Sequence, residues 1–146
     1  MRTLAVAIGM TLLLTAVSAA QVVPPFSMTR LYTTEAEFAR AIQPYQRAIA
    51  ANPRNARAQY WLGFAYLYAY RQWIVSAAPY ASAYLERAVP PLQEAIKLDP
   101  LMVEGYLALQ DAYQLMGDLD KANETVALML RRTRPGWLPG VPAPAP

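Results

Sequence analysis

Apolar residues recur at helical spacing along most of the chain after residue 34. The first stretch carries its apolar side chains at steps of three and four: Phe38, Ala41, Ile42, Tyr45, Ala48 and Ile49. Such a stripe is typical of an amphipathic helix. Residues 55–74, 104–116 and 119–132 repeat the pattern, and we find no alternating strand pattern between them. The chain is therefore predicted to be all-α, with antiparallel helical hairpins joined by short turns.

The predicted helices have recognisable start and stop signals. Asn52-Pro53 and Asp99-Pro100 are stops, because the residue before a proline is driven out of the helical conformation. Gly117-Asp118 reads as a turn in which the glycine ends one helix and the aspartate caps the next. Thr34, with Glu37 three residues later, fits a capping box at the start of the first helix.

A repeat becomes visible when the chain is aligned with itself. Residues 41–53 match residues 88–100 at an offset of 47, with alanine, proline, glutamine, alanine, isoleucine and proline coinciding in order. Pro44 and Pro91 are equivalent in this alignment. They predict either a repeated kink inside two helices or helices that begin near the two prolines.

These motifs resemble the tetratricopeptide repeat (TPR), whose signature is Trp-x2-Leu-Gly-x2-Tyr, then Ala-x3-Phe, then Pro. The corresponding residues are Gln59, Leu62, Gly63 and Tyr66, then Ala88, Leu92 and Pro100, and in the next unit Tyr106, Leu109, Tyr113, Ala122 and Val126. The resemblance covers roughly residues 34 to 132 and implies a short TPR-like superhelix. The middle unit departs from the pattern, because residues 71–83 hold extra length that is expected to lengthen a hairpin and bend near Ala78-Pro79.

TPR proteins as a family bind peptides or partner proteins on the concave surface formed by the first helix of each repeat. The residues of this chain that the resemblance places on that surface are Arg57, Tyr60, Phe64, Tyr68, Glu104, Leu107, Asp111 and Gln114. Tyr60, Phe64 and Tyr68 fit a groove and a core equally well, whereas Trp61 fits the core better. The lysine and asparagine pattern with which some relatives clamp a terminal carboxylate is absent.

Tyrosines crowd the extended middle unit. The set comprises Tyr66, Tyr68, Tyr70, Tyr80 and Tyr84. They could form an aromatic face for a partner or a second copy, or pack the inserted segment against its own chain. Because the end helices of a short repeat array leave an apolar face uncovered, some self-association is expected.

The first twenty residues have the pattern of a secretory signal. Arg2 precedes an apolar run from Leu4 to Val17, and residues 18–20 are small, as a signal peptidase requires. We therefore predict a signal peptide at 1–20, an N-terminal extension at 21–33, a helical domain at 34–134 and a Pro-rich tail at 135–146. The mature protein is expected in the periplasm or outside the cell.

Composition narrows the possible chemistry. The chain has no cysteine and no histidine, so no thiolate or imidazole can act in catalysis or bind a metal, and no cofactor is expected. The net charge of +3 falls to +2 without Arg2, which is weak for a protein that binds nucleic acid or an anionic membrane. The carboxylates that a carboxylate-dependent enzyme could use are Glu86, Glu94, Asp111 and Asp118, and their spacing selects no pair.

The sequence thus predicts a non-enzymatic protein-binding scaffold, exported to the cell envelope or secreted, with a protein or peptide partner that it does not identify. A nucleic-acid-binding helical repeat and a carboxylate-dependent enzyme are the two alternatives.

Overall fold

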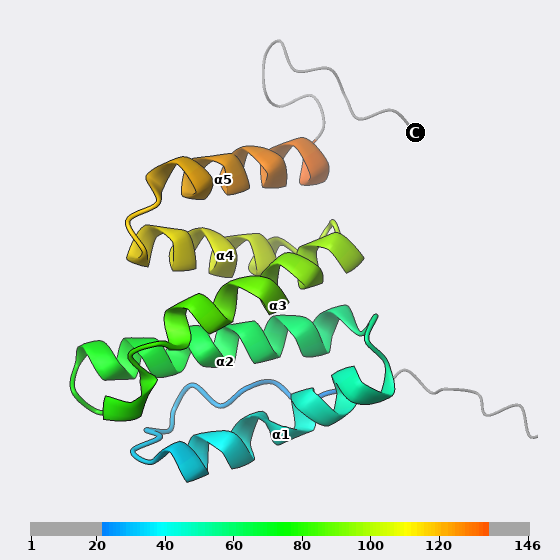
Figure 1. Cartoon of the computed structure of the whole chain (residues 1–146). Coiled ribbons are helices and arrows are strands. Elements are labelled where there is room, and N and C mark those ends of the chain that lie inside the picture. The colour runs from blue at the N-terminus through cyan, green and yellow to red at the C-terminus, as the bar shows by residue number, and fades with distance from the viewer. Residues whose placement is uncertain (1–21, 135–146) are drawn as a thin grey trace, which may run out of the picture.

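The computed structural model describes residues 22–134, and this part of the chain is helical without strands (Figure 1). The elements are α1 (Glu35–Ala51), α2 (Ala56–Ile74), the single-turn 3-10 helix η1 (Pro79–Ala81), α3 (Tyr84–Leu98), α4 (Val103–Leu115) and α5 (Leu119–Thr133). The all-α prediction is confirmed. The predicted signal peptide at 1–20 and the tail at 135–146 lie outside the described residues.

The repeat of 47 residues is present in the fold. Under this offset α1 and α3 end at equivalent residues, and α2 and α4 begin at equivalent residues. Asn52 and Asp99, the residues before the two prolines, both adopt non-helical backbone angles, and their N–H groups donate to the carbonyls of Ala48 and Ala95. The two proline-punctuated segments therefore occupy like places, as the alignment predicts.

The helices continue through their internal prolines. Pro44 lies inside α1 and Pro91 inside α3, so the alternative in which these helices begin near the prolines is wrong. Proline removes one hydrogen bond, to the carbonyl four residues earlier. Those carbonyls belong to Arg40 and Arg87, which are both exposed, so water can satisfy the freed acceptors.

Predicted caps are found at both ends of the repeat region. The N–H of Glu37 donates to the Thr34 hydroxyl at 3.3 Å, but the Glu37 carboxylate accepts from Thr33 instead of completing the box. Gly117 has a φ of +78°, and the N–H of Asp118 donates to a carbonyl one turn back in α4, which is a Schellman ending. The Asp118 side chain then caps α5, as predicted.

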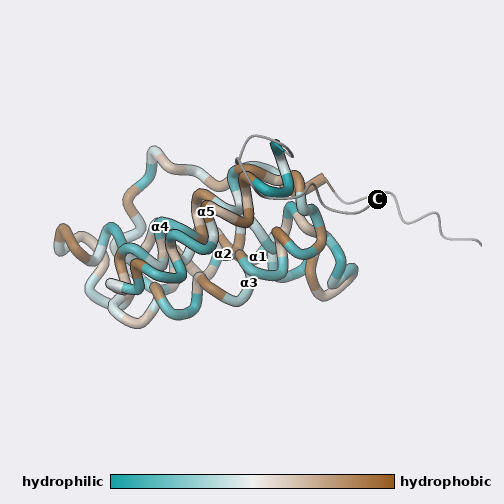
Figure 2. The backbone as a smooth tube through the Cα atoms, turned by 90° about the horizontal axis from the view of Figure 1, so that it is seen from above, coloured by the Kyte–Doolittle hydropathy of each residue, from teal (hydrophilic) through white to brown (hydrophobic). Residues whose placement is uncertain are grey.

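The helices pair as antiparallel hairpins, α2 with α3 and α4 with α5, and the hairpins stack through α3 and α4 (Figure 1). Seen from above, brown and teal positions alternate along the helices, as amphipathic helices require (Figure 2). Gly63 allows the close approach of α2 and α3, because a Cβ there would lie 2.6 Å from Leu92 Cγ and 2.9 Å from the Ala88 carbonyl oxygen. Leu92 and Ala88 are completely buried in the core between α2, α3 and α4.

Candidate functional site

The N-terminal extension is an ordered part of the fold. We call its described residues, 22–33, the strap. The strap runs in extended form between α1 and α2 and turns back into α1 (Figure 1). Its side chains Val23, Phe26 and Tyr32 are buried against the two helices. Among residues 22–134 no helix precedes α1, and the strap covers the apolar side of α1 and α2 that a preceding helix would cover. The expectation of an uncovered apolar face therefore needs correction at this end of the array.

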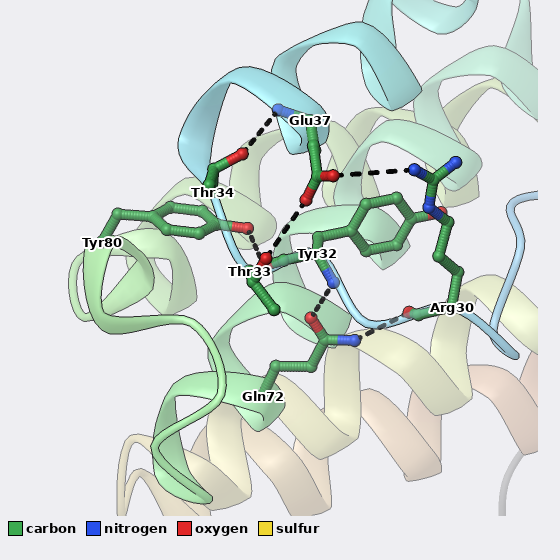
Figure 3. Close-up of polar contacts among 7 residues, drawn as sticks. All are labelled: Arg30, Tyr32, Thr33, Thr34, Glu37, Gln72 and Tyr80. Atoms are coloured by element: carbon green, nitrogen blue, oxygen red, sulfur yellow. Dashed lines mark hydrogen bonds and ion pairs between the residues drawn. The ribbon is translucent and has the colours of Figure 1, made fainter.

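Side chains of α2 and the inserted segment hold the strap through its backbone (Figure 3). The N–H of Tyr32 donates to Gln72 Oε1 at 3.0 Å, and Gln72 Nε2 donates to the Arg30 carbonyl at 2.9 Å. The Tyr80 hydroxyl donates to the Tyr32 carbonyl at 2.7 Å, and the Tyr68 hydroxyl donates to the Met28 carbonyl. Gln72 and the tyrosines thus give the extended backbone the partners that a helix would supply internally.

Sequence reasoning missed Gln72, although a signal was present. Ala65 and Ala69 are fully buried on one face of α2, and Gln72 follows at helical spacing on that face. Gln72 is 5% exposed, and both ends of its amide are bonded. A glutamine on a buried helix face needs polar partners, since an unsatisfied buried amide is costly. Its position therefore indicated a backbone segment packed against α2.

A pocket of about 480 Å³ opens beside the strap on the α2 and α4 side. The strap contributes Met28 and Leu31 to its wall. The other lining residues, from α2, its C-terminal cap and α4, are Phe64, Leu67, Tyr68, Arg71, Gln72, Val75 and Asp111. The lining is mostly apolar, and Leu31 and Val75 are more than half exposed. The site is therefore an open, largely apolar hollow rather than a closed cavity.

The charges at this pocket neutralise one another. Arg71 Nη2 lies 2.6 and 2.5 Å from the two carboxylate oxygens of Asp111, so the ion pair joins α2 to α4 at the rim. These are the charged residues of the lining. The pocket consequently favours a neutral apolar group over a charged one.

The eight residues predicted for the groove fall into three groups. Phe64, Tyr68 and Asp111 line the pocket together. Leu107 and Gln114 are exposed on α4 and do not line it. The remaining three form a second, separate contact.

This second contact joins Arg57 of α2 to Glu104 of α4, which are equivalent residues of the repeat. A backbone hydrogen bond and the Arg57 side chain lower the pKa of Glu104. Tyr60 lies under Arg57, with the guanidinium carbon 5.9 Å from the ring centre, and is only 7% exposed. Tyr60 is thus a core residue that supports the ion pair, and the half-buried Trp61 packs against both core clusters.

The tyrosines of the extended unit contact other aromatic rings of the chain. The Tyr84 ring lies 5.3 Å from that of Tyr66 and 5.2 Å from that of Phe38. Burial, and a hydrogen bond from its hydroxyl to Glu35, raise the pKa of Tyr84 to about 12. Burial and nearby Glu37 raise that of Tyr80 to about 12 as well. Residues 75–83 bend at η1, as predicted, and their tyrosine, Tyr80, contacts Phe38 of α1 and the strap.

The carboxylates considered for catalysis are found in separate salt bridges or at the surface. Asp111 pairs with Arg71, Glu94 with Lys97 at 3.2 Å, and Asp118 with Lys121. Glu86 is exposed. Within residues 22–134, no group of three or more acidic residues is placed to hold a metal ion.

Comparison with known proteins identifies one family. Residues 31–67, which span the end of the strap, α1 and the first part of α2, match the family described as TPR repeat. No curated protein matches the chain. A search of the described helices for a membrane-spanning segment finds none of sufficient length and apolar character. The match identifies residues 31–67 as similar to a tetratricopeptide repeat, and the stacked helical hairpins agree with it.

Proposed function

We propose that this protein is a non-enzymatic, exported scaffold that binds a partner protein by taking an apolar side chain of the partner into the pocket between the strap, α2 and α4. The pocket is the observation that carries the proposal. It combines exposed apolar walls with a paired, neutral rim, which suits a protein segment better than a charged ligand. TPR repeats in general mediate contacts between proteins, which agrees with this use of the surface.

The partner segment enters between Leu31 on the strap and Phe64 on α2. Aromatic residues in partly buried positions supply much of the binding energy at protein interfaces. Phe64 is half-buried and anchored by the ring of Tyr60 at 5.8 Å, so it is already held in place before a partner arrives. A rigid anchor loses little side-chain entropy on binding.

The test compares two matched leucine variants. Leu31→Asp places a charge in the pocket wall, whereas Leu101→Asp makes the same change in the turn between α3 and α4; the two leucines are 59% and 67% exposed. The immobilised mature protein is incubated with the proteins exported by the same cells, and the bound proteins are identified. We expect Leu31→Asp to lose a defined partner that the wild type and Leu101→Asp retain. Loss from both variants, or from neither, would contradict binding in this pocket.

Export is tested separately. The proposal expects the protein outside the cytoplasm with Gln21 as its first residue, because the pattern at residues 18–20 fits signal peptidase. N-terminal sequencing of the protein recovered from the cell envelope or medium checks this. An intact Met1 on protein confined to the cytoplasm would refute it.

A further inference from the structure

We propose that the strap is a displaceable internal ligand, and that the surface beneath it is a second binding site, for an extended peptide with two aromatic residues six positions apart and a basic residue two positions before the second. This surface lies beneath the strap, whereas the pocket of the proposed function lies beside it; the two share Tyr68 and Gln72, and the strap forms one wall of the pocket.

The way in which the strap is held is that of a bound peptide. Gln72 accepts from the N–H of Tyr32 and donates to the carbonyl of Arg30 (Figure 3). One amide side chain thus pairs with both a donor and an acceptor of the extended backbone. The hydroxyls of Tyr68 and Tyr80 bind further strap carbonyls. Within the described residues, no backbone-to-backbone hydrogen bond joins the strap to a helix. Backbone recognition of this kind is independent of the side chains of the segment that is bound.

Three side chains of the strap define the ligand pattern. Phe26 packs with its ring centre 5.6 Å from that of Tyr68 and 6.4 Å from that of Tyr45. Tyr32, six residues later, lies 6.0 Å from the Phe38 ring. Arg30 places its guanidinium 3.7 Å from the Glu37 carboxylate and over the Tyr32 ring. A competing peptide therefore needs both aromatic anchors, and the acidic side chain favours a basic residue between them.

Release of the strap leaves most of the fold intact. The buried core formed by α2, α3, α4 and α5 contains no strap residue. The buried strap residues Val23, Phe26 and Tyr32 belong to a second cluster, which they form with α1 and with the face of α2 that carries Ala58, Ala65 and Ala69. An element whose contacts are confined to one such cluster can open without global unfolding. The strap is consequently the part of the described chain that is best placed to exchange for a ligand in trans.

Hydrogen exchange on the full mature protein tests the opening. The buried N–H of Tyr32 reports on the strap, and the fully buried Ala112 in α4 reports on global unfolding. We expect the Tyr32 amide to exchange at least ~tenfold faster than that of Ala112. Gln72→Ala should accelerate exchange at Tyr32 further and leave Ala112 unchanged. Equal rates at the two amides in the wild type would show that the strap opens only when the protein unfolds, and would overturn the proposal.

Peptide binding tests the vacated site. The full-length mature chain carrying Phe26→Asp should release its own strap and bind a fluorescent peptide of residues 22–33, at least ~tenfold more tightly than the wild type, in which the internal strap competes. The same peptide carrying Phe26→Asp is the matched control and should not bind. If circular dichroism shows that Phe26→Asp has lost helix, Val23→Asp, at another buried strap residue, provides the chain with the weakened strap and leaves the site itself unchanged. A helical variant that binds neither peptide, or both equally, would refute the site.

Discussion

Replacement of Gly63 by alanine tests how closely α2 and α3 are packed. A Cβ on Gly63 would lie 2.6 Å from Leu92 Cγ and 2.9 Å from the carbonyl oxygen of Ala88. Both distances are shorter than van der Waals contact. Leu92 is completely buried, and the carbonyl belongs to the backbone of α3, so neither atom can move without separating the helices. We therefore expect the added methyl group to destabilise the fold by about 3 kcal/mol, the upper part of the range for overpacked cores.

Alanine also has a favourable effect, since it is a better helix former than glycine by about 1 kcal/mol. The net expectation for Gly63→Ala is a loss of about 2 kcal/mol in the free energy of unfolding. Gly105→Ala, in α4, is the matched control: its Cβ would come closest to Ile96 Cγ2 at 2.8 Å, and its three nearest contacts are all side-chain atoms, with no backbone atom among them. In Gly105→Ala the Ile96 side chain must shift, at a cost of about 1 kcal/mol. The better helix propensity of alanine offsets this cost, so the free energy of unfolding should stay close to the wild-type value.

Urea unfolding followed by circular dichroism measures both variants. At a slope of about 2 kcal/mol per molar urea, the midpoint of Gly63→Ala should fall by about 1 M and that of Gly105→Ala should stay near the wild-type value. A Gly63→Ala protein as stable as the wild type would refute the reasoning, because it would show that the two helices are not in the close contact described.

Three further predictions follow from single contacts. Thr34→Ala removes the acceptor for the Glu37 N–H and should lower the free energy of unfolding by about 1 kcal/mol in urea titrations, whereas Thr34→Ser should retain most of it. Glu104→Gln breaks an exposed ion pair with Arg57 and should cost less than ~1 kcal/mol in the same assay, so a larger loss would mean that the pair is desolvated. Tyr84 has its pKa raised to about 12 in the folded protein, against about 10 when unfolded. Its contribution to stability is therefore complete below pH 10 and is lost as the pH rises towards 12; Tyr84→Phe should flatten this loss when unfolding is measured across that pH range.

The local elements of this protein could be predicted because their signals are local. Proline after Asn52 and Asp99 ends a helix wherever the chain folds, and glycine at 117 permits the positive φ of a helix ending. Helical periodicity and the offset of 47 residues likewise require no knowledge of contacts. The class of fold, the order of the helices and the equivalence of the repeats therefore follow from the sequence alone.

The placement of individual side chains depended on what packs against each helix. Tyr60 and Phe64 lie on neighbouring positions of α2, yet Tyr60 is buried and Phe64 lines the pocket. The helical periodicity places both residues on apolar faces of α2, but it does not determine which other segment of the chain covers each of them. The strap shows the same limit, because an extended segment held by Gln72 and tyrosine hydroxyls has no periodic signal of its own. Helix formation is encoded over a few residues. The pocket and the strap instead depend on contacts between segments some 40 residues apart, such as Tyr32 with Gln72 and Arg71 with Asp111. Only the tertiary structure brings these segments together.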